Sequence, residues 1–238
     1  MLQKILFLVL LVSFKLSACA IHTSGPVKVI ITGDISGGKT SIVTELAARG
    51  YHVVPEVATR VFVEEYTKLD ALYPEKAPHN HPLQIENLQQ KIFAGQERAY
   101  NEALVHSMLY PPKNNLIVFD RSEFDSFVYS QIFYPADFFS PVDRKAFSKK
   151  INRALTHQHY NQHAIFCDIV PQELYNGRMS NCARHEDYND AVQIGSNIHK
   201  YYKEEFGFIL HHVGFHDTIA SKTDTVEALL LHIASAQE

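Results

Sequence analysis

Cysteine is scarce in this sequence and basic residues are in no excess, and each absence excludes a class of protein. Three cysteines among 238 residues are too few for a disulfide scaffold, and no C-x-x-C pair indicates a zinc or redox site. Because Cys19 lies in an N-terminal leader, the rest of the chain could form one bridge at most. The formal net charge of -4 argues against a general nucleic-acid-binding protein. We therefore expect no nucleic-acid partner.

Long hydrophobic runs are also missing, apart from one near the N-terminus. Residues 5–14 are almost continuously apolar, but the run is shorter than the roughly 20 residues that a membrane-spanning helix needs. Small residues then lead to Cys19, so residues 1–24 resemble a bacterial lipoprotein signal in which this cysteine would be lipidated. Lys15 interrupts that pattern. The alternative is an upstream extension or a hydrophobic tail. The first interpretation predicts a membrane-anchored lipoprotein, and the second a cytoplasmic protein.

The remaining residues, 25–238, have the length and composition of a single globular domain, with no internal repeat or low-complexity tract. Apolar, β-branched runs alternate with amphipathic stretches, which indicates a parallel sheet covered by helices on both faces. The sequence thus predicts one three-layer α/β domain. The expected strands are residues 27–32, 51–56, 116–120, 164–170 and 208–213. The expected helices are residues 39–50, 57–69, 83–109, 122–133 and 141–158, one that ends at 206–207, and one at the C-terminus.

A glycine-rich loop follows the first expected strand. The stretch "GDISGGKT" fits the pattern G-x-x-x-x-G-K-[ST], with a strand before it and a helix after it. Glycines let the backbone curl so that successive N–H groups converge on phosphate oxygens, and the following helix directs its positive end to the same place. We expect the lysine to reach the β- and γ-phosphates and the threonine to bind Mg²⁺. The predicted nucleotide-binding residues are Gly33, Asp34, Ile35, Ser36, Gly37, Gly38, Lys39, Thr40 and Ser41.

Acidic residues follow the second and third expected strands, at the sheet edge where ligands bind in open α/β sheets. Asp120 ends "LIVFD" and is a candidate Mg²⁺ ligand beside Thr40, or alternatively the N-cap of the next helix. Glu56 ends "VVPE" and is a candidate base for an attacking hydroxyl. Arg121 could hold Glu56 through a charge-assisted pair, and the alternative for both is a structural salt bridge.

These motifs carry a family resemblance. The stretches "VIITGDISGGKTSIVTELAARGYHVVPEVATRVF" and "VFDRSEFDSFVYSQ" resemble the kinase-like AAA ATPase domain family. That family includes the nicotinamide-riboside kinase domain of NadR-type proteins and the TRPL-translocation-defect type of eukaryotic protein, and its layout is similar to that of deoxynucleoside kinases. The resemblance implies a P-loop kinase fold with five parallel strands in the order 2-3-1-4-5. It also implies a base-like Glu56, and Asp120 and Arg121 beside the metal.

The resemblance further implies a lid between the fourth strand and the penultimate helix. Arg178 and Arg184 lie there and are candidates to close on the phosphates, or else solvated surface arginines. Gln96 lies where nucleoside kinases often place a base-reading glutamine, although many helix glutamines face water. Two residues depart from the family pattern. Asp34 puts a negative charge in the phosphate loop, and Thr59 stands where relatives often have an arginine.

Two function hypotheses follow. In the first, the protein is an enzyme that transfers the γ-phosphoryl group of ATP or GTP to a small, nucleoside-like acceptor with Mg²⁺. In the second, it is a nucleotide-gated binding module that hydrolyses slowly or not at all and contacts a protein or lipid partner. Fourteen histidines are present, but none shows zinc-ligand spacing, so we expect them to serve surface or packing roles. No pattern in the sequence specifies an oligomeric state.

Overall fold

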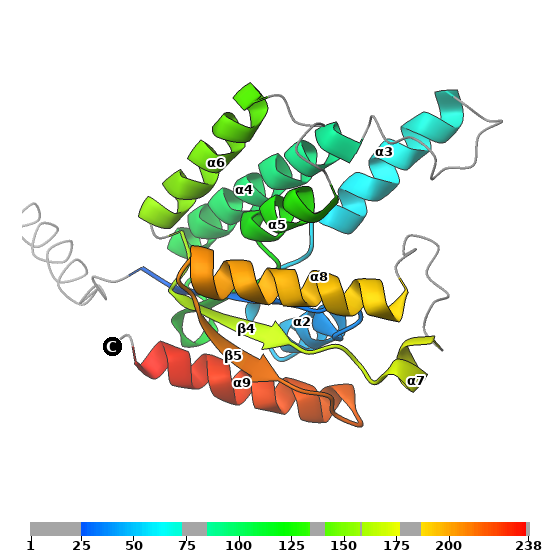
Figure 1. Ribbon diagram of the computed structural model, residues 1–238. Helices are drawn as coiled ribbons and strands as arrows, with labels where there is room; N and C mark the ends of the chain where they lie inside the picture. The colour runs from blue at the N-terminus through cyan, green and yellow to red at the C-terminus, as the bar shows by residue number, and fades with distance from the viewer. Residues whose placement is uncertain (1–24, 73–84, 134–140, 158, 177–186, 237–238) are drawn as a thin grey trace, which may run out of the picture.

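The computed structural model describes residues 25–72, 85–133, 141–157, 159–176 and 187–236, drawn in colour in Figure 1. Three predicted features lie outside these residues. They are the leader with Cys19 and the two lid candidates, Arg178 and Arg184. None of the helices in the described ranges is both long enough and apolar enough to cross a membrane.

The central sheet has five parallel strands in the order β2-β3-β1-β4-β5, as predicted. The order places β1 at the centre and makes β2 and β5 the edge strands, so the loop after β1 lies in the middle of the carboxyl edge. The strands are β1 (Val27–Gly33), β2 (His52–Val54), β3 (Leu116–Asp120), β4 (His163–Cys167) and β5 (Ile209–Val213).

Helices cover both faces of the sheet and make a three-layer domain (Figure 1). On one face α2 packs against α9. On the other face α4, α5 and α8 pack together, with α3 against α4 and α6 against α5. The helices are α2 (Lys39–Ala48), α3 (Ala58–Leu72), α4 (Ile85–Leu109), α5 (Glu123–Phe133), α6 (Pro141–Thr156), α7 (Gln172–Asn176), α8 (Tyr188–Lys200) and α9 (Ile219–Ser235). A 3₁₀ turn, η2, spans Lys113–Asn115, and a π-helical turn, η3, spans Tyr201–Glu205.

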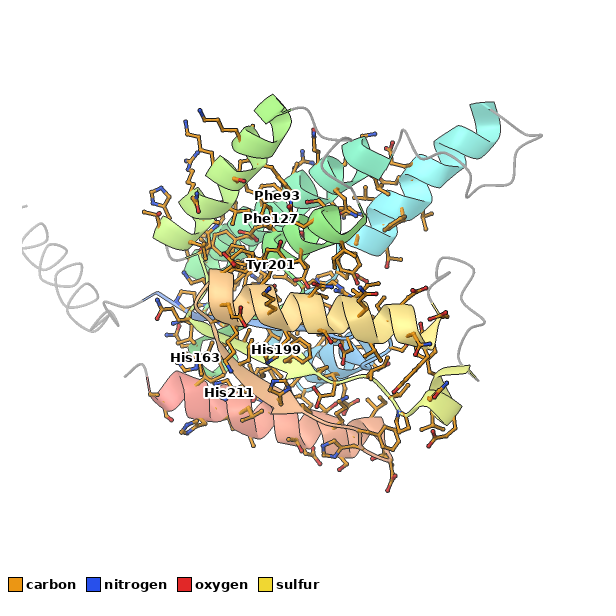
Figure 2. The ribbon with its side chains drawn as sticks, in the orientation of Figure 1. Phe93, Phe127, His163, His199, Tyr201 and His211 are labelled. Carbon is orange, nitrogen blue, oxygen red and sulfur yellow. The ribbon has the colours of Figure 1, made fainter. Side chains whose placement is uncertain are left out.

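Strand alternation divides the core into two clusters, one on each face of the sheet. In β3, Leu116 and Val118 join the cluster under α2 and α9, whereas Ile117 and Phe119 join the cluster under α4, α5 and α8. The second cluster is rich in aromatic residues, several of which are labelled on that side of the molecule in Figure 2. The same alternation directs Asp120, which ends β3, toward the α2 face.

Several predicted elements are longer than the observed ones. The second strand was predicted over residues 51–56 but ends at Val54, because Pro55 has no N–H for the ladder. The fourth strand was predicted to residue 170 but ends at Cys167, since the N–H of Ile169 donates to a side chain instead. The helix predicted to end at residues 206–207 is α-helical to Lys200 and then widens into η3. The short helix α7 was not predicted.

Candidate functional site

The glycine-rich loop lies directly against the end of β4. Gly33 has a φ of +120°, and a Cβ at this position would lie 2.4 Å from the carbonyl oxygen of Cys167. A Cβ on Gly37 would lie 2.7 Å from the same oxygen. Only glycine therefore allows the loop to turn this tightly against its neighbouring strand. The loop leads into α2, whose first N–H groups have no acceptor within the helix and are available to an anion.

The loop lysine is buried at the base of this turn. Lys39 Nζ donates to the backbone oxygens of Gly33 and Asp34, the two residues where β1 passes into the loop. Burial, followed by the charge of Arg121, lowers the pKa of Lys39 to about 8. The protein thus holds an ammonium group in a position where solvent does not stabilise it, so an anionic ligand would stabilise its charged form.

Asp34 is part of the loop, and its carboxylate is directed toward the chain that follows β4. Its N–H donates to Cys167 O at 2.9 Å, and its carboxylate accepts from the N–H of Ile169 at 2.7 Å. Burial raises the pKa of this carboxyl group, although the bond from Ile169 opposes the effect. Both polar groups therefore join the loop to the chain that follows β4, because a buried carboxylate needs a donor and Ile169 supplies one.

Asp120 is a buried carboxylate at the end of β3. It is 3% exposed, and among the described residues neither of its oxygens has a hydrogen-bond partner of good geometry, although the Thr40 hydroxyl lies close by. Burial raises its pKa to about 6, and the charge of Glu56 adds to this, while Arg121, Lys39 and the nearby Thr40 hydroxyl oppose it. Two unpaired carboxylate oxygens beside the exposed hydroxyl of Thr40 fit the ligand set of Mg²⁺, which prefers oxygen ligands and retains several waters.

The alternative role of Asp120 as a helix cap is taken by other residues. Ser122 Oγ accepts from the N–H of Phe124, and the Asp125 carboxylate accepts from the N–H of Ser122 at 2.9 Å. This reciprocal arrangement is a variant of the capping box at the start of α5, in which the Ser122 hydroxyl accepts from the second helical N–H instead of the third. Asp120 is therefore left free of a capping role.

The predicted pairing between Arg121 and Glu56 is confirmed. Arg121 Nε lies 2.9 Å from Glu56 Oε1, and Thr59 Oγ1 donates to Glu56 Oε2 at 3.0 Å. Arg121 adopts a left-handed backbone conformation with φ +69°, and its N–H donates to Ile31 O. Such a conformation costs a non-glycine residue about 1–2 kcal/mol, so the surrounding bonds must hold Arg121 in place.

A buried hydrogen-bond network that was not predicted supports Arg121 from behind. Asp125 Oδ1 accepts from Thr32 Oγ1 at 2.6 Å and lies 3.3 Å from Arg121 Nη1. Asp125 Oδ2 accepts from the hydroxyl of Tyr202 at 2.7 Å, and this hydroxyl also bonds Ser122. The network connects the ends of β1 and β3 to η3 and fixes the guanidinium that holds Glu56.

Of the remaining predicted site residues, Gln96 and Ile35 are buried, and Thr40 and Ser41 are exposed. Gln96 is 6% exposed, and its Oε1 accepts from Ser126 Oγ at 2.7 Å, so it is buried at the contact of α4 with α5 instead of facing water. The side chain of Ile35 belongs to the hydrophobic core, which leaves only its backbone for a ligand. Ser41 and Thr40 are exposed in the first turn of α2.

In the described part of the chain, Cys167 and the pair of His163 and His211 pack against neighbouring residues. Cys167 is a buried free thiol, and burial raises its pKa to about 11. His163 and His211, labelled in Figure 2, stack with their ring nitrogens 2.9 Å apart. Across the described residues, no group of three or more His, Cys, Asp or Glu side chains has an arrangement that could hold a metal ion.

A parallel sheet of this order, with a glycine-rich loop and lysine after its central strand, defines the P-loop kinase fold. The chain belongs to the AAA domain family, whose model matches residues 28–218. A search of curated proteins gave no match.

Solved structures of two kinds share the fold. Deoxyadenosine kinase from M. mycoides with bound dATP is 15% identical with a TM-score of 0.56, and the alignment covers 86% of this chain and 98% of that chain. The NadR protein in complex with NR is 16% identical with a TM-score of 0.53, and the alignment covers 86% of this chain and 48% of that one. At these identities the likeness concerns the fold alone.

Proposed function

We propose that this protein is a phosphotransferase that moves the γ-phosphoryl group of ATP or GTP to a hydroxyl of a small, nucleoside-like acceptor. The observation that carries the proposal is the position of Glu56. Arg121 holds this carboxylate at the same sheet edge as Lys39 and Asp120, near enough for its charge to raise the pKa of Asp120. A candidate phosphate-binding lysine, a candidate metal ligand and a candidate base thus lie near one another, and this arrangement supports phosphoryl transfer.

The donor's phosphates would bind on the glycine-rich loop. The N–H groups at the start of α2 would contact the phosphate oxygens, and the ammonium of Lys39 would exchange its backbone carbonyls for the β- and γ-phosphates. Asp120 and Thr40 would hold Mg²⁺, directly or through water. When bound, the ion would offset negative charge on the phosphates.

The acceptor would bind on the Glu56 side of the loop. Its hydroxyl oxygen would form a new bond to the γ-phosphorus as the bond from that phosphorus to the β,γ-bridging oxygen breaks. The hydroxyl proton would pass to Glu56, and the nucleoside diphosphate would leave with the bridging oxygen. Arg121 would keep the Glu56 carboxylate oriented through its 2.9 Å contact.

The bond from Ser126 fixes which end of the Gln96 amide could contact an acceptor. Ser126 donates to Oε1 and occupies one of its two lone pairs, whereas both Nε2 hydrogens remain to be offered to a ligand, so the amide is mainly a donor. We therefore infer that Gln96 would favour an acceptor whose ring or amide presents a carbonyl oxygen. Closure of Arg178 and Arg184 over the phosphates remains an expectation of the sequence.

One observation favours a second candidate function, a nucleotide-gated binding module. Both oxygens of Glu56 have protein partners, Arg121 and Thr59, so the carboxylate could serve as a structural ion pair. In that case nucleotide binding would be retained while turnover would be slow or absent.

Substitution of Glu56 separates the two candidates. Wild type, Glu56→Gln and Lys39→Ala are assayed with nucleosides and nicotinamide riboside, with MgATP and MgGTP as donors, while nucleotide affinity is measured by calorimetry. As a kinase, the wild type turns over and Glu56→Gln loses about 10²- to 10⁴-fold in kcat with its nucleotide affinity retained. Glu64→Gln, on the exposed side of α3, is the matched control and keeps full activity. If the wild type binds nucleotide but turns over none of the acceptors, the kinase proposal is wrong and the second candidate function, a nucleotide-gated binding module, is retained.

A further inference from the structure

Helix α9 places a lysine on its buried side, behind the glycine-rich loop. Val226, Leu230 and Ile233 form the apolar stripe of α9 that joins the core under α2. Lys222 precedes Val226 by one turn and so continues this stripe, and it is only 4% exposed. A lysine in this position costs free energy to bury, so its charge calls for a specific partner.

That partner belongs to the loop itself. Lys222 Nζ donates to the carbonyl oxygen of Gly37 at 2.9 Å. The same helix packs onto the loop through Ile219, whose Cδ1 lies 3.6 Å from where a Cβ of Gly38 would be. On its other side Gly37 lies against the end of β4 at Cys167. The Gly37–Gly38 peptide is thus enclosed between β4 and α9.

The contact fixes the orientation of the loop's amides. In a trans peptide the C=O and the N–H point in opposite directions, so a carbonyl directed at Lys222 turns the N–H of Gly38 away from α9. The next N–H groups, those of Lys39 and Thr40, begin α2. The orientation that Lys222 imposes therefore prepares the amides that would bind phosphate.

Two ammonium groups consequently lie around the loop. Lys39 bonds the carbonyl oxygens at its beginning, and Lys222 bonds the carbonyl oxygen next to its final turn. Both lie near enough to Cys167 for their charges to lower the pKa of its buried thiol, against the larger effect of burial. A phosphate bound by the N–H groups of the glycine-rich loop would interact with the charges of both Lys39 and Lys222.

We propose that Lys222 is a positioning residue of the nucleotide site, which fixes the Gly37–Gly38 peptide for phosphate binding and adds a second positive charge behind it. The inference rests on the proposed triphosphate site and identifies a residue outside the loop motif as part of it. A preformed loop loses less conformational freedom when the ligand binds, and a nearby charge favours a polyanion most strongly at low ionic strength.

The test compares Lys222→Met, Lys222→Arg and a matched control, Lys28→Met, in the full chain. Lys28 is another partly buried lysine, at the opposite end of β1, where its Nζ bonds the hydroxyl of Tyr100. Dissociation constants for MgATP, MgADP and adenosine are measured by calorimetry at two salt concentrations, and each variant's melting temperature is measured without ligand.

We expect Lys222→Met to weaken MgATP binding by about tenfold or more at low salt, the size of a lost bond to a charged group. The loss should be smaller for MgADP, absent for adenosine, and reduced at high salt. Lys222→Arg should restore most of the affinity, and Lys28→Met should bind like the wild type. The melting temperature of Lys222→Met should stay close to that of the wild type, because relief from burying the charge offsets the loss of the donor to the Gly37 carbonyl.

Two results would overturn the inference. Equal MgATP affinity in Lys222→Met and wild type would remove any role in nucleotide binding. A parallel loss of affinity and melting temperature that Lys222→Arg fails to restore would reduce Lys222 to a structural residue. If the wild type itself does not bind MgATP or MgGTP, the proposed function fails first and the inference falls with it.

Discussion

Asp34 Oδ1 occupies the position beside Gly195 where any other residue would have its Cβ. A Cβ on residue 195 would lie 1.3 Å from that oxygen. Gly195 is buried on α8, and the other oxygen of Asp34 accepts from the N–H of Ile169. The glycine-rich loop, the chain after β4 and the middle of α8 therefore meet at one carboxylate.

This fit predicts that Gly195→Ala destabilises the protein by about 2 kcal/mol, because overpacking of a buried contact typically costs 1–3 kcal/mol. In an Asp34→Ala background the same substitution should cost less than 0.5 kcal/mol, since the oxygen it meets is gone. Urea unfolding of both single variants and the double variant gives the coupling energy. Ser196→Ala, on the exposed side of α8, is the control. Additive effects would contradict the contact.

Asp120 should make stability depend on pH. Its folded pKa of about 6 lies above the usual aspartate value of 3.8, so its stabilising contribution is present below about pH 4 and is lost as the pH rises through 6. At pH 7.5 the ionised carboxylate should cost on the order of 3 kcal/mol. Asp120→Asn should therefore unfold at higher urea than wild type at pH 7.5, with little gain at pH 4.

The same comparison of wild type and Asp120→Asn by urea unfolding should depend on Mg²⁺. Millimolar Mg²⁺ with ATP should narrow the difference between wild type and Asp120→Asn at pH 7.5, because a cation compensates only the wild-type carboxylate. Asp217→Asn, at an exposed position before α9, should follow the wild type throughout. An Asp120→Asn variant that gains nothing above pH 6 would contradict the position of Asp120 in an unpaired, buried environment.

Triphosphate affinity should fall as pH rises through about 8. The pKa of Lys39 is about 8 because the amine is buried and near Arg121, and phosphates bind only its charged form strongly. Once the pH exceeds 8, the dissociation constant should rise by up to tenfold per pH unit. Lys39→Arg should flatten the profile between pH 7.5 and 9.5, whatever its affinity, because arginine stays charged. A flat wild-type profile would mean that Lys39 does not contact the phosphates.

The hydroxyl of Tyr202 should contribute to stability separately from its buried ring. Tyr202→Phe keeps the ring in the aromatic cluster but removes the donor to Asp125, so we expect a loss of about 1–3 kcal/mol in the free energy of unfolding. Tyr201→Phe, the neighbouring residue in η3, is the control and should change stability by less than 0.5 kcal/mol. Equal effects of the two substitutions would contradict the network.

The strand positions, the glycine-rich loop and the pair between Arg121 and Glu56 could be predicted from the residues themselves. A β-branched run, a glycine-rich loop and an acid at a strand end each specify their structure over a few residues, and the family resemblance supplied the order of the strands. Ser122 and Asp125 also carried a local signal, since S-x-x-D before a helix indicates a capping box. That signal identifies the cap but not the bonds of Asp125 to Thr32 and Tyr202, which depend on distant segments.

Lys222 and Asp34 show what the sequence could not specify. A lysine in line with Val226 and Leu230 indicates a buried ammonium, but its partner on Gly37 lies 185 positions earlier in the chain. The direction of the Asp34 carboxylate depends on Ile169 and Gly195, which approach the loop only after the sheet has formed. Nothing near Asp34 in sequence distinguishes this direction from one toward a ligand.

The central position of β1 has a consequence for biosynthesis. This strand leaves the ribosome before both of its neighbours, because β3 and β4 follow it along the chain, and α9 emerges later still. The backbone hydrogen-bonding groups on its two edges cannot all be paired until the nascent polypeptide has grown past residue 167, and Lys222 is added later still. A truncated translation product that lacks α9 would consequently carry the loop motif without Lys222 behind it. We expect such a product to bind nucleotide less tightly than a chain that contains α9.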